Sequence, residues 1–227
     1  MKNIITTDSI TKLYKHRDGL IHALNNVSFS INKGDFTTIT GPSGSGKTTL
    51  LLALSGLIKI SSGSIKFENK ELFNLNDNDL AEYRKKHVGF VMQNFSLVPY
   101  LTAIQNVMIP LGLNKIESSK QKNLATAVLE MVGLGNRANH FPRELSAGQQ
   151  QRVAIARALV NKPDIIFADE PTGNLDQETE EEILKLFKKV NQEMKKTFII
   201  VTHEPSMLQH SNRIYKVEGG KVFEIHS

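Results

Sequence analysis

Apolar and β-branched residues follow two kinds of strand pattern along the chain. Near the N-terminus they alternate with polar residues, as in half-buried strands, over residues 4–7, 10–14 and 27–31. Elsewhere they form short runs of the kind that is buried in a parallel sheet, at residues 36–40, 88–92, 165–168 and 197–202. Two runs at 213–217 and 221–225 surround a Gly-Gly pair and predict a hairpin. The pattern therefore predicts a small antiparallel layer beside a mostly parallel sheet.

A helical spacing fills the middle of the chain. Between residues 94 and 162 the apolar residues recur at helical intervals, as in Leu124, Val128 and Leu129. Further helices are predicted at residues 50–57, 80–86 and 177–196. The last of these carries glutamates in its first turns and lysines near its end, which suits the helix dipole. We therefore expect one α/β domain over residues 1–227, with a helical subdomain inserted at about 94–162.

A glycine-rich segment lies between a predicted strand and a predicted helix. It reads Gly41-Pro42-Ser43-Gly44-Ser45-Gly46-Lys47-Thr48-Thr49. Closely spaced glycines let backbone N–H groups converge on one point, and the helix N-terminus adds the positive end of its dipole. We interpret the segment as a polyphosphate cradle, in which Lys47 reaches the β- and γ-phosphates and the Thr48 hydroxyl binds the accompanying Mg²⁺. The alternative is a plain glycine-rich turn with a solvated lysine.

Two carboxylates, Asp169 and Glu170, directly follow the apolar run at 165–168. In open α/β sheets the carboxyl ends of the strands form the edge at which ligands bind, so these side chains are predicted to share an edge with the glycine-rich segment. One carboxylate can hold Mg²⁺ and the other can accept a proton from an attacking water. We assign Asp169 to the metal and Glu170 to the general base. The alternative is an acidic turn at the end of a strand.

The composition excludes only a few classes of protein and of functional site. With 227 residues and 40% hydrophobic content the chain can bury a substantial core. The absence of cysteine excludes disulfides, thiolate metal sites and cysteine nucleophiles. The N-terminus has no secretory leader pattern, and no window approaches the about 18 apolar residues of a membrane span. The formal charge of +5 comes from 28 basic and 23 acidic residues that are mixed along the chain, which is typical of a solvated surface rather than a nucleic-acid patch.

Several further motifs follow in a fixed order. They are Gln93 after a predicted strand, Leu145-Ser146-Ala147-Gly148-Gln149 before a predicted helix, Asn174-Leu175-Asp176, and Val201-Thr202-His203-Glu204. Together with the phosphate loop and the paired carboxylates, they resemble the motifs of the ATP-binding cassette (ABC) ATPases over essentially the whole chain. The Leu-Ser-x-Gly-Gln element is specific to that family, although Ala147 stands where glycine is usual. The resemblance implies a P-loop NTPase fold: a RecA-like, mostly parallel sheet with an N-terminal antiparallel β subdomain and an inserted α-helical subdomain.

The resemblance also implies roles for individual residues. In such ATPases Gln93 senses the γ-phosphate through Mg²⁺ or water, and His203 hydrogen-bonds that phosphate and acts with Glu170. Tyr14 resembles the aromatic residue that stacks on adenine, where it supplies apolar contact and little base discrimination. Taken alone, Gln93, His203 and Tyr14 would each be read as ordinary surface or packing residues. The cofactors implied are ATP and Mg²⁺, with Thr48, Gln93 and Asp169 around the metal.

Members of this family work as head-to-tail dimers, so the resemblance implies a second copy of the chain as partner. Each ATP then lies between the phosphate loop of one subunit and the signature residues Ser146, Gly148 and Gln149 of the other, with Asp176 also at the contact. Ser146 and Gly148 suit this physically because they offer a hydroxyl and an N–H at a helix N-terminus. Ordinary helix capping uses the same groups. The Ala147 methyl leaves the backbone N–H available, so we expect tuning rather than loss of the site.

The segments 93–107 and 169–176 look most similar to the branch that contains lipoprotein-release, macrolide-efflux and antimicrobial-peptide-resistance ATPases. This resemblance implies a peripheral protein at the cytoplasmic face of the membrane, bound to separate permease subunits and powering export, lipoprotein release or mechanotransmission. Phe95, Leu97, Val98 and Tyr100 are candidates for a socket that holds the permease, or for core residues of the helical lobe. The alternatives are a regulatory ATPase of the cell-division type and a soluble cassette that acts on nucleic acid or ribosomes.

Overall fold

The N-terminal part of the chain forms an antiparallel sheet in the computed structural model, which describes residues 2–17 and 19–225. Its strands are β1 (Asn3–His16), β2 (Gly19–Asn32), β4 (Ser62–Phe67) and β5 (Lys70–Glu71), in the order β2-β1-β4-β5. The antiparallel layer is thus confirmed. The break predicted between residues 7 and 10 is a bulge within one long strand instead. Ser9 adopts a left-handed conformation there (φ 50°), and the register with β2 shifts while pairing continues on both sides.

The second sheet is mostly parallel, as the apolar runs predicted. It contains β3 (Phe36–Thr40), β6 (Val88–Met92), β7 (Ile165–Asp169), β8 (Thr197–Val201), β9 (Arg213–Glu218) and β10 (Lys221–Ile225), in the order β10-β9-β3-β8-β7-β6. Every neighbouring pair is parallel except the terminal hairpin of β9 and β10. The carboxyl ends of β3, β8, β7 and β6 therefore lie next to one another along one edge.

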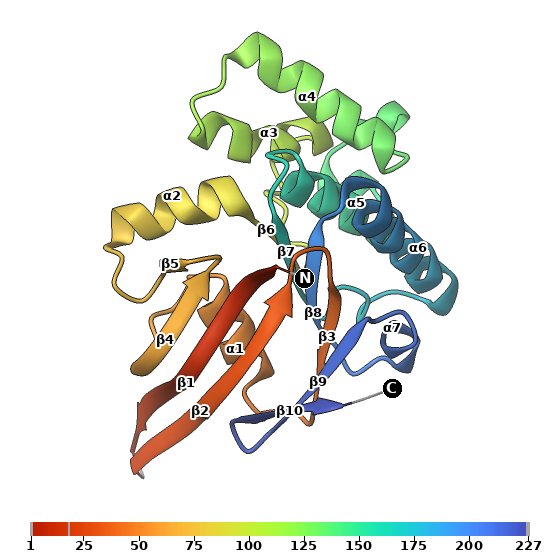
Figure 1. The fold of residues 1–227 in the computed structure, drawn as a ribbon. Coiled ribbons are helices and arrows are strands. Elements are labelled where there is room, and N and C mark those ends of the chain that lie inside the picture. The colour runs from red at the N-terminus through yellow and green to blue at the C-terminus, as the bar shows by residue number, and fades with distance from the viewer. Residues whose placement is uncertain (1, 18, 226–227) are drawn as a thin grey trace.

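The helices divide into those that flank the sheets and those of the middle segment. They are α1 (Lys47–Leu54), α2 (Asp77–His87), α3 (Ala103–Leu113), α4 (Ser118–Met131), α5 (Ala147–Leu159), α6 (Gln177–Met194) and α7 (Pro205–Leu208). Helices α3 to α5 lie between β6 and β7 in the chain, and α3 and α4 form the upper part of the molecule in Figure 1. Helix α1 begins earlier than predicted, at Lys47, because Gly46 closes the loop directly onto its first turn. Helix α6 ends at Met194 because Lys195 adopts a left-handed cap conformation.

Alternation along the buried strands divides the apolar side chains between two cores. In β7, Ile165 and Phe167 face the antiparallel sheet and α1, whereas Ile166 and Ala168 face the helices α3 to α6. Both faces are thus covered, which explains why this strand is apolar throughout. The two sheets are also joined directly, because the Tyr215 hydroxyl on β9 donates a hydrogen bond to the carbonyl of Ser30 on β2 at 2.9 Å.

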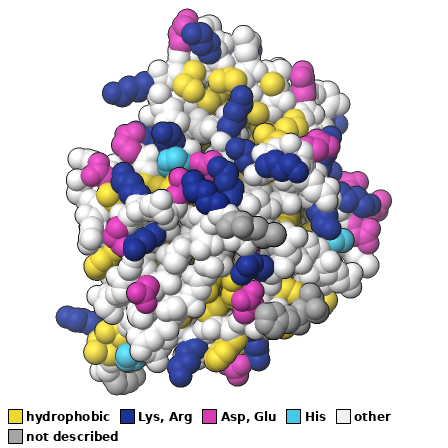
Figure 2. All heavy atoms as spheres, viewed as in Figure 1, with side chains coloured by type: hydrophobic (Ala, Val, Ile, Leu, Met, Phe, Trp, Pro, Cys, Tyr) yellow, Lys and Arg dark blue, Asp and Glu magenta, His cyan; other side chains and the backbone are white. Residues whose placement is uncertain are grey.

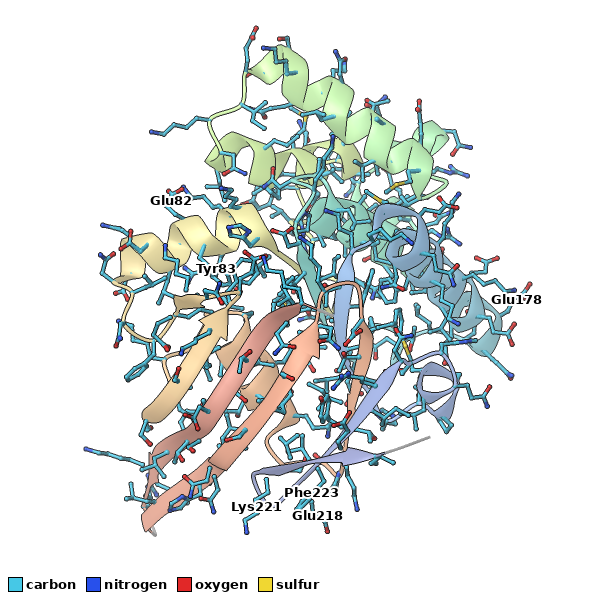
Figure 3. All side chains as sticks on the ribbon, in the orientation of Figure 1. Glu82, Tyr83, Glu178, Glu218, Lys221 and Phe223 are labelled. Atoms are coloured by element: carbon cyan, nitrogen blue, oxygen red, sulfur yellow. The ribbon has the colours of Figure 1, made fainter. Side chains whose placement is uncertain are left out.

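The outer surface is mixed in charge and polar. On α2, Tyr83 points down towards the antiparallel sheet and is buried, whereas Glu82 points away into solvent (Figure 3). Figure 2 shows basic and acidic side chains interspersed over one face, as their mixing along the chain predicted. Among the described residues, no helix is both long and apolar enough to cross a membrane.

Candidate active site

Four chain segments converge at the edge where the parallel strands end. The phosphate loop follows β3, His203 comes after β8, Asp169 ends β7 with Glu170 directly after it, and Gln93 follows β6. Since these strands are neighbours in register, the segments lie side by side although they are distant in sequence. The sequence prediction that the loop and the carboxylates share an edge is correct.

The phosphate loop lines a cleft of about 770 Å³. The other lining residues are Tyr14, Ile21, His22, Ala23, Glu170, His203, Gly219 and Gly220, and all nine predicted loop residues from Gly41 to Thr49 contribute. A Cβ on Gly46 would lie only 2.2 Å from the carbonyl oxygen of Ala23, and one on Gly41 would lie 2.1 Å from that of Val217. Both glycines also have positive φ, so their absence of a side chain is a requirement of the fold and not only of a ligand.

Lys47 and Thr48 point into the functional edge from the first turn of α1. The Lys47 ammonium donates hydrogen bonds of 2.9 Å to the carbonyls of Gly41 and Pro42, which places the cation across the mouth of the loop. The first N–H groups of α1 have no acceptor within the helix, and they add to the positive potential there. The site therefore combines a flexible cation with oriented backbone dipoles, which is the chemistry that binds polyphosphate.

Asp169 and Thr48 form a candidate magnesium site. The Thr48 hydroxyl donates to Asp169 Oδ1 at 3.3 Å, joining the phosphate loop to the end of β7. Burial raises the pKa of Asp169, and the neighbouring Glu170 raises it further, while the Thr48 hydroxyl and the Lys47 charge oppose that shift. A hydroxyl, a carboxylate and the amide oxygen of Gln93 are all hard oxygen donors, so the residues present fit Mg²⁺.

Glu170 and His203 both line the cleft, and their side chains are in contact. The Glu170 Oε2 lies 2.9 Å from His203 Nδ1, and Glu204 lies 3.5 Å from the other ring nitrogen. The backbone of Glu170 is left-handed (φ 44°), which is unusual for a residue with a side chain, and its N–H donates to the carbonyl of Val201 at 2.8 Å. This strained backbone aims the carboxylate at the cleft rather than along the strand.

Gln93 lies beside Glu170 over a glycine. A Cβ added to Gly173 would lie 3.1 Å from Gln93 Nε2 and 3.5 Å from Glu170 Oε2. Asn174 Nδ2 also donates to the Gln93 carbonyl at 3.1 Å. Gln93 is thus adjacent to the carboxylates, as expected. The role of Gly173 depends on this packing, and the sequence analysis did not identify it.

The far end of the cleft holds Tyr14. This side chain is 42% exposed, and the ammonium of Lys12 lies 5.1 Å from the ring centroid on β1. Gly219 and Gly220, which the sequence analysis treated only as a hairpin turn, form a wall of the same cleft. The Gly220 N–H donates to the Ser45 carbonyl at 3.1 Å, and its carbonyl accepts from Asn25 at 2.8 Å. The turn between β9 and β10 is therefore fastened to the phosphate loop.

The signature residues lie outside this cleft. Ser146 caps α5 by accepting from the Gln149 N–H at 3.3 Å, while Gln149 Oε1 accepts from the Ser146 N–H at 3.1 Å. The Ser146 hydroxyl keeps its own proton for another acceptor. Asp176 caps α6 through Thr179, and these hydrogen bonds lower the pKa of Asp176. None of the predicted signature residues lines the cleft, so one chain does not bring them together with its own phosphate loop.

The proposed permease socket is divided in the structure. Leu97 packs against the helical core, whereas Tyr100 is 77% exposed. A groove of about 300 Å³ is lined by other residues: Leu57, Val88, Gly89, Phe90, Met92, Pro110, Arg157, Ala158 and Asn161. Met92 directly precedes Gln93, so this groove adjoins the functional edge.

Comparison with known proteins places this geometry in a family. A family model described as "ABC transporter" matches residues 24–173. An uncharacterized ABC transporter ATP-binding protein of Thermotoga maritima is 44% identical over 98% of this chain and 94% of its own length. The lipoprotein-releasing system ATP-binding protein LolD of Francisella tularensis is 43% identical over 96% of this chain and 95% of its own. The macrolide export ATP-binding/permease protein MacB of Syntrophobacter fumaroxidans is 41% identical over 97% of this chain, which spans 31% of that protein.

Solved structures agree with the sequence relatives. A dimeric, post-hydrolysis structure of the ATP-binding cassette MJ0796, a protein of Methanocaldococcus jannaschii, contains ADP and Pi. It superposes with a TM-score of 0.90 at 40% identity, covering 98% of this chain and 99% of its own. The chain therefore belongs to the ABC transporter family, as a nucleotide-binding ATPase that hydrolyses ATP to ADP and phosphate and is close in sequence to the LolD and MacB type.

Proposed function

We propose that two copies of this chain form a head-to-tail dimer in which each ATP is bound by the phosphate loop of one copy and the signature helix of the other. The observation that carries this proposal is the exposure of Ser146 outside the chain's own cleft, at a helix N-terminus and with a hydroxyl proton that no described residue accepts. A single chain then supplies half of each hydrolytic site. The dimeric state of the related cassette supports this arrangement.

Within that site the residues divide the chemistry of in-line phosphoryl transfer to water. Lys47 and the loop amides meet the negative charge on the transferred phosphoryl group. Thr48, Asp169 and Gln93 would hold Mg²⁺, which when bound neutralises charge on the phosphate oxygens. Glu170 accepts a proton from the attacking water, and His203, whose Nδ1 lies 2.9 Å from the Glu170 carboxylate, orients the γ-phosphate. Tyr14 stacks on the adenine, and Gln149 and Asp176 support the contact with the second copy.

The dimer drives separate membrane permease subunits, most closely in the manner of the export and lipoprotein-release relatives. The groove beside Gln93 supports this proposal because its lining is largely apolar and it adjoins the hydrolytic edge. The protein would then lie at the cytoplasmic face of the membrane, held there by the permease. Regulation of a cell-division machine is the alternative that shares this mechanism. A soluble cassette on nucleic acid or ribosomes is disfavoured by the mixing of basic and acidic residues along the chain and by the interspersed charges on the face that Figure 2 shows.

The experiment that tests the site is Glu170→Gln. The change keeps the side-chain size and removes the base, so we expect ATP binding and ATP-dependent dimerisation to persist while phosphate release falls by about 10²–10⁴-fold. Light scattering measures the dimer, and a phosphate-release assay measures turnover. Steady-state hydrolysis at the unmodified rate would remove Glu170 from the base role. Recovery of only soluble nucleic-acid complexes, rather than a membrane permease, from detergent extracts would remove the transporter proposal.

A further inference from the structure

The turn that follows Gln93 has a strained backbone. Phe95 and Ser96 are both left-handed, with φ values of 58° and 47°, and neither is a glycine. Each such residue costs free energy that the surrounding structure must offset, and strain of this kind tends to occur at functional positions. The turn begins at the residue before the catalytic edge, since the Phe95 N–H donates to the Met92 carbonyl at 3.1 Å across Gln93. The conformation of this turn therefore sets the direction in which Gln93 leaves β6.

Arg157 on α5 holds the strained turn. Its guanidinium donates one hydrogen bond to the Ser96 carbonyl at 2.6 Å and a second to the Phe95 carbonyl at 2.9 Å. Within the described residues, no carboxylate lies at salt-bridge distance from Arg157. Among the described residues, the partners of this half-buried cation are two neutral carbonyls, which makes it costly compared with an apolar side chain of similar size. Core packing alone does not explain this choice of residue.

We infer that Arg157 is a positioning residue for ATP hydrolysis, which fixes the Phe95–Ser96 turn so that Gln93 reaches the metal and the attacking water beside Glu170. This inference rests on the proposed role of Gln93. Helix α5 carries Arg157 near one end, and Ser146, the N-cap at the other end, is about 16 Å away at 1.5 Å per residue. In the proposed dimer, the signature end of α5 in one copy contacts the ATP held by the phosphate loop of the other copy. The same helix, through Arg157, then connects that ATP to Gln93 of its own chain.

Arg152 provides a matched control on the same helix. Its guanidinium also binds a backbone carbonyl, that of Val132 at 3.0 Å, and a carboxylate of Glu182 at 2.8 Å. Both partners belong to the helical lobe and to α6 rather than to the catalytic edge. Changing Arg152→Gln removes a comparable set of hydrogen bonds from α5 without touching the turn. A change in kinetics or stability that both Arg152→Gln and Arg157→Gln cause would result from disturbing α5 itself and not from moving Gln93.

The experiment compares ATP hydrolysis by the intact dimer carrying Arg157→Gln, Arg157→Lys, Arg152→Gln, Gln93→Ala, or Arg157→Gln together with Gln93→Ala. For Arg157→Gln we expect kcat to fall about 10–100-fold and the Mg²⁺ concentration for half-maximal rate to rise, with KM for ATP nearly unchanged. Arg157→Lys keeps the positive charge but loses the planar guanidinium fork, and it is expected to lose less. Arg152→Gln should lower the melting temperature at least as much as Arg157→Gln while keeping the unmodified Mg²⁺ dependence. The double variant should be no slower than Gln93→Ala alone, because both changes act through one group.

The outcomes separate this inference from the function on which it rests. Unmodified Mg²⁺ dependence in Gln93→Ala would overturn the proposed role of Gln93. A strong effect of Gln93→Ala beside unmodified kinetics in both Arg157 variants would overturn the inference alone. Additive losses in the double variant, or an equal kinetic effect of Arg152→Gln, would also overturn it. If Arg157→Gln does not fold, Arg157→Lys decides, because unmodified kinetics in that variant contradict a need for the guanidinium fork that holds both carbonyls.

Discussion

Gly148, in the signature sequence, is packed so tightly within its own chain that any side chain would collide with a neighbour. A Cβ at this position would lie 2.4 Å from the Thr179 methyl carbon on α6. Ordinary contacts between carbons are about 3.5–4.0 Å, so the overlap exceeds 1 Å. Thr179 cannot easily rotate away, because its hydroxyl donates to Asp176 at 2.7 Å and its N–H donates to the same carboxylate at 3.0 Å.

We therefore expect Gly148→Ala to destabilise the protein by about 1–3 kcal/mol, the usual cost of overpacking, and to lower the melting temperature by about 2–12 °C for a chain of this size. Adding Thr179→Ser removes the colliding methyl and keeps the hydroxyl, so the double variant should recover most of the loss. Differential scanning fluorimetry measures the stability, and phosphate release measures the ATPase activity. Because the added methyl points at Thr179 in the same chain, we expect the activity to return with the stability.

Gly112→Ala is the matched control, since this helical glycine on α3 has only a side-chain oxygen of Gln121 at 4.0 Å. Alanine there should stabilise the helix by about 1 kcal/mol. If the Gly148→Ala protein had the same melting temperature as the unmodified protein, the packing argument would be refuted. A double variant that is stable but inactive would show instead that Gly148 is required by the bound nucleotide of the second copy.

Further predictions follow from the packing of single residues. Gly46→Ala should unfold the phosphate loop and abolish the binding of a fluorescent ATP analogue, since its Cβ would meet a backbone carbonyl at 2.2 Å; retained binding would contradict this. Tyr83→Phe should raise the melting temperature because its buried hydroxyl has no hydrogen-bond partner among the described residues, whereas Tyr215→Phe should lower it by about 2–4 °C through loss of about 1 kcal/mol. Burial raises the pKa of both tyrosines above 10.0, so each ionises more readily in the unfolded chain; this has no effect on stability below that pH, and it lowers stability as the pH rises through the folded-state pKa. Each phenylalanine variant should therefore show a flatter alkaline melting profile. Gly173→Ala should displace Gln93 and lower kcat while leaving the melting temperature within about 1 °C, and a loss confined to stability would count against that contact.

The sequence was sufficient for the parts of the fold and site that depend on local order. A phosphate loop is one continuous segment, and Asp169 and Glu170 directly follow a recognisable strand, so their meeting at the sheet edge follows from topology. The break predicted near Ser9 was wrong because a bulge tolerates the polar pair that interrupts the alternation. Whether β1 continues through the bulge depends on its pairing with β2 and β4, and the residues of β1 alone do not contain that information.

Residues that act through packing were not accessible to the same reasoning. Arg157 lies in a helix that is otherwise read as a signature motif, and its carbonyl partners follow Gln93, more than sixty positions earlier in the chain. Neither Thr179 nor Gly173 has a side chain that suggests a catalytic role. Only the structure shows that Thr179 packs against Gly148 and that Gly173 leaves room for Gln93. The exposure of Tyr100 was likewise undetermined, because an aromatic residue in a loop has the same pattern whether it is buried or not.

The fastening of the phosphate loop to the β9–β10 hairpin has a consequence for the order in which the protein matures. Gly41 packs on Val217, and the Gly220 N–H binds the Ser45 carbonyl, so the loop reaches its shape only after the hairpin has joined the sheet. The loop emerges early during synthesis, whereas the hairpin follows every other described element. A nascent chain that stops before β9 should therefore lack a competent ATP cradle even with its phosphate-loop residues all present. Nucleotide binding would thus coincide with completion of the sheet, and ATP would stabilise only chains that have finished folding.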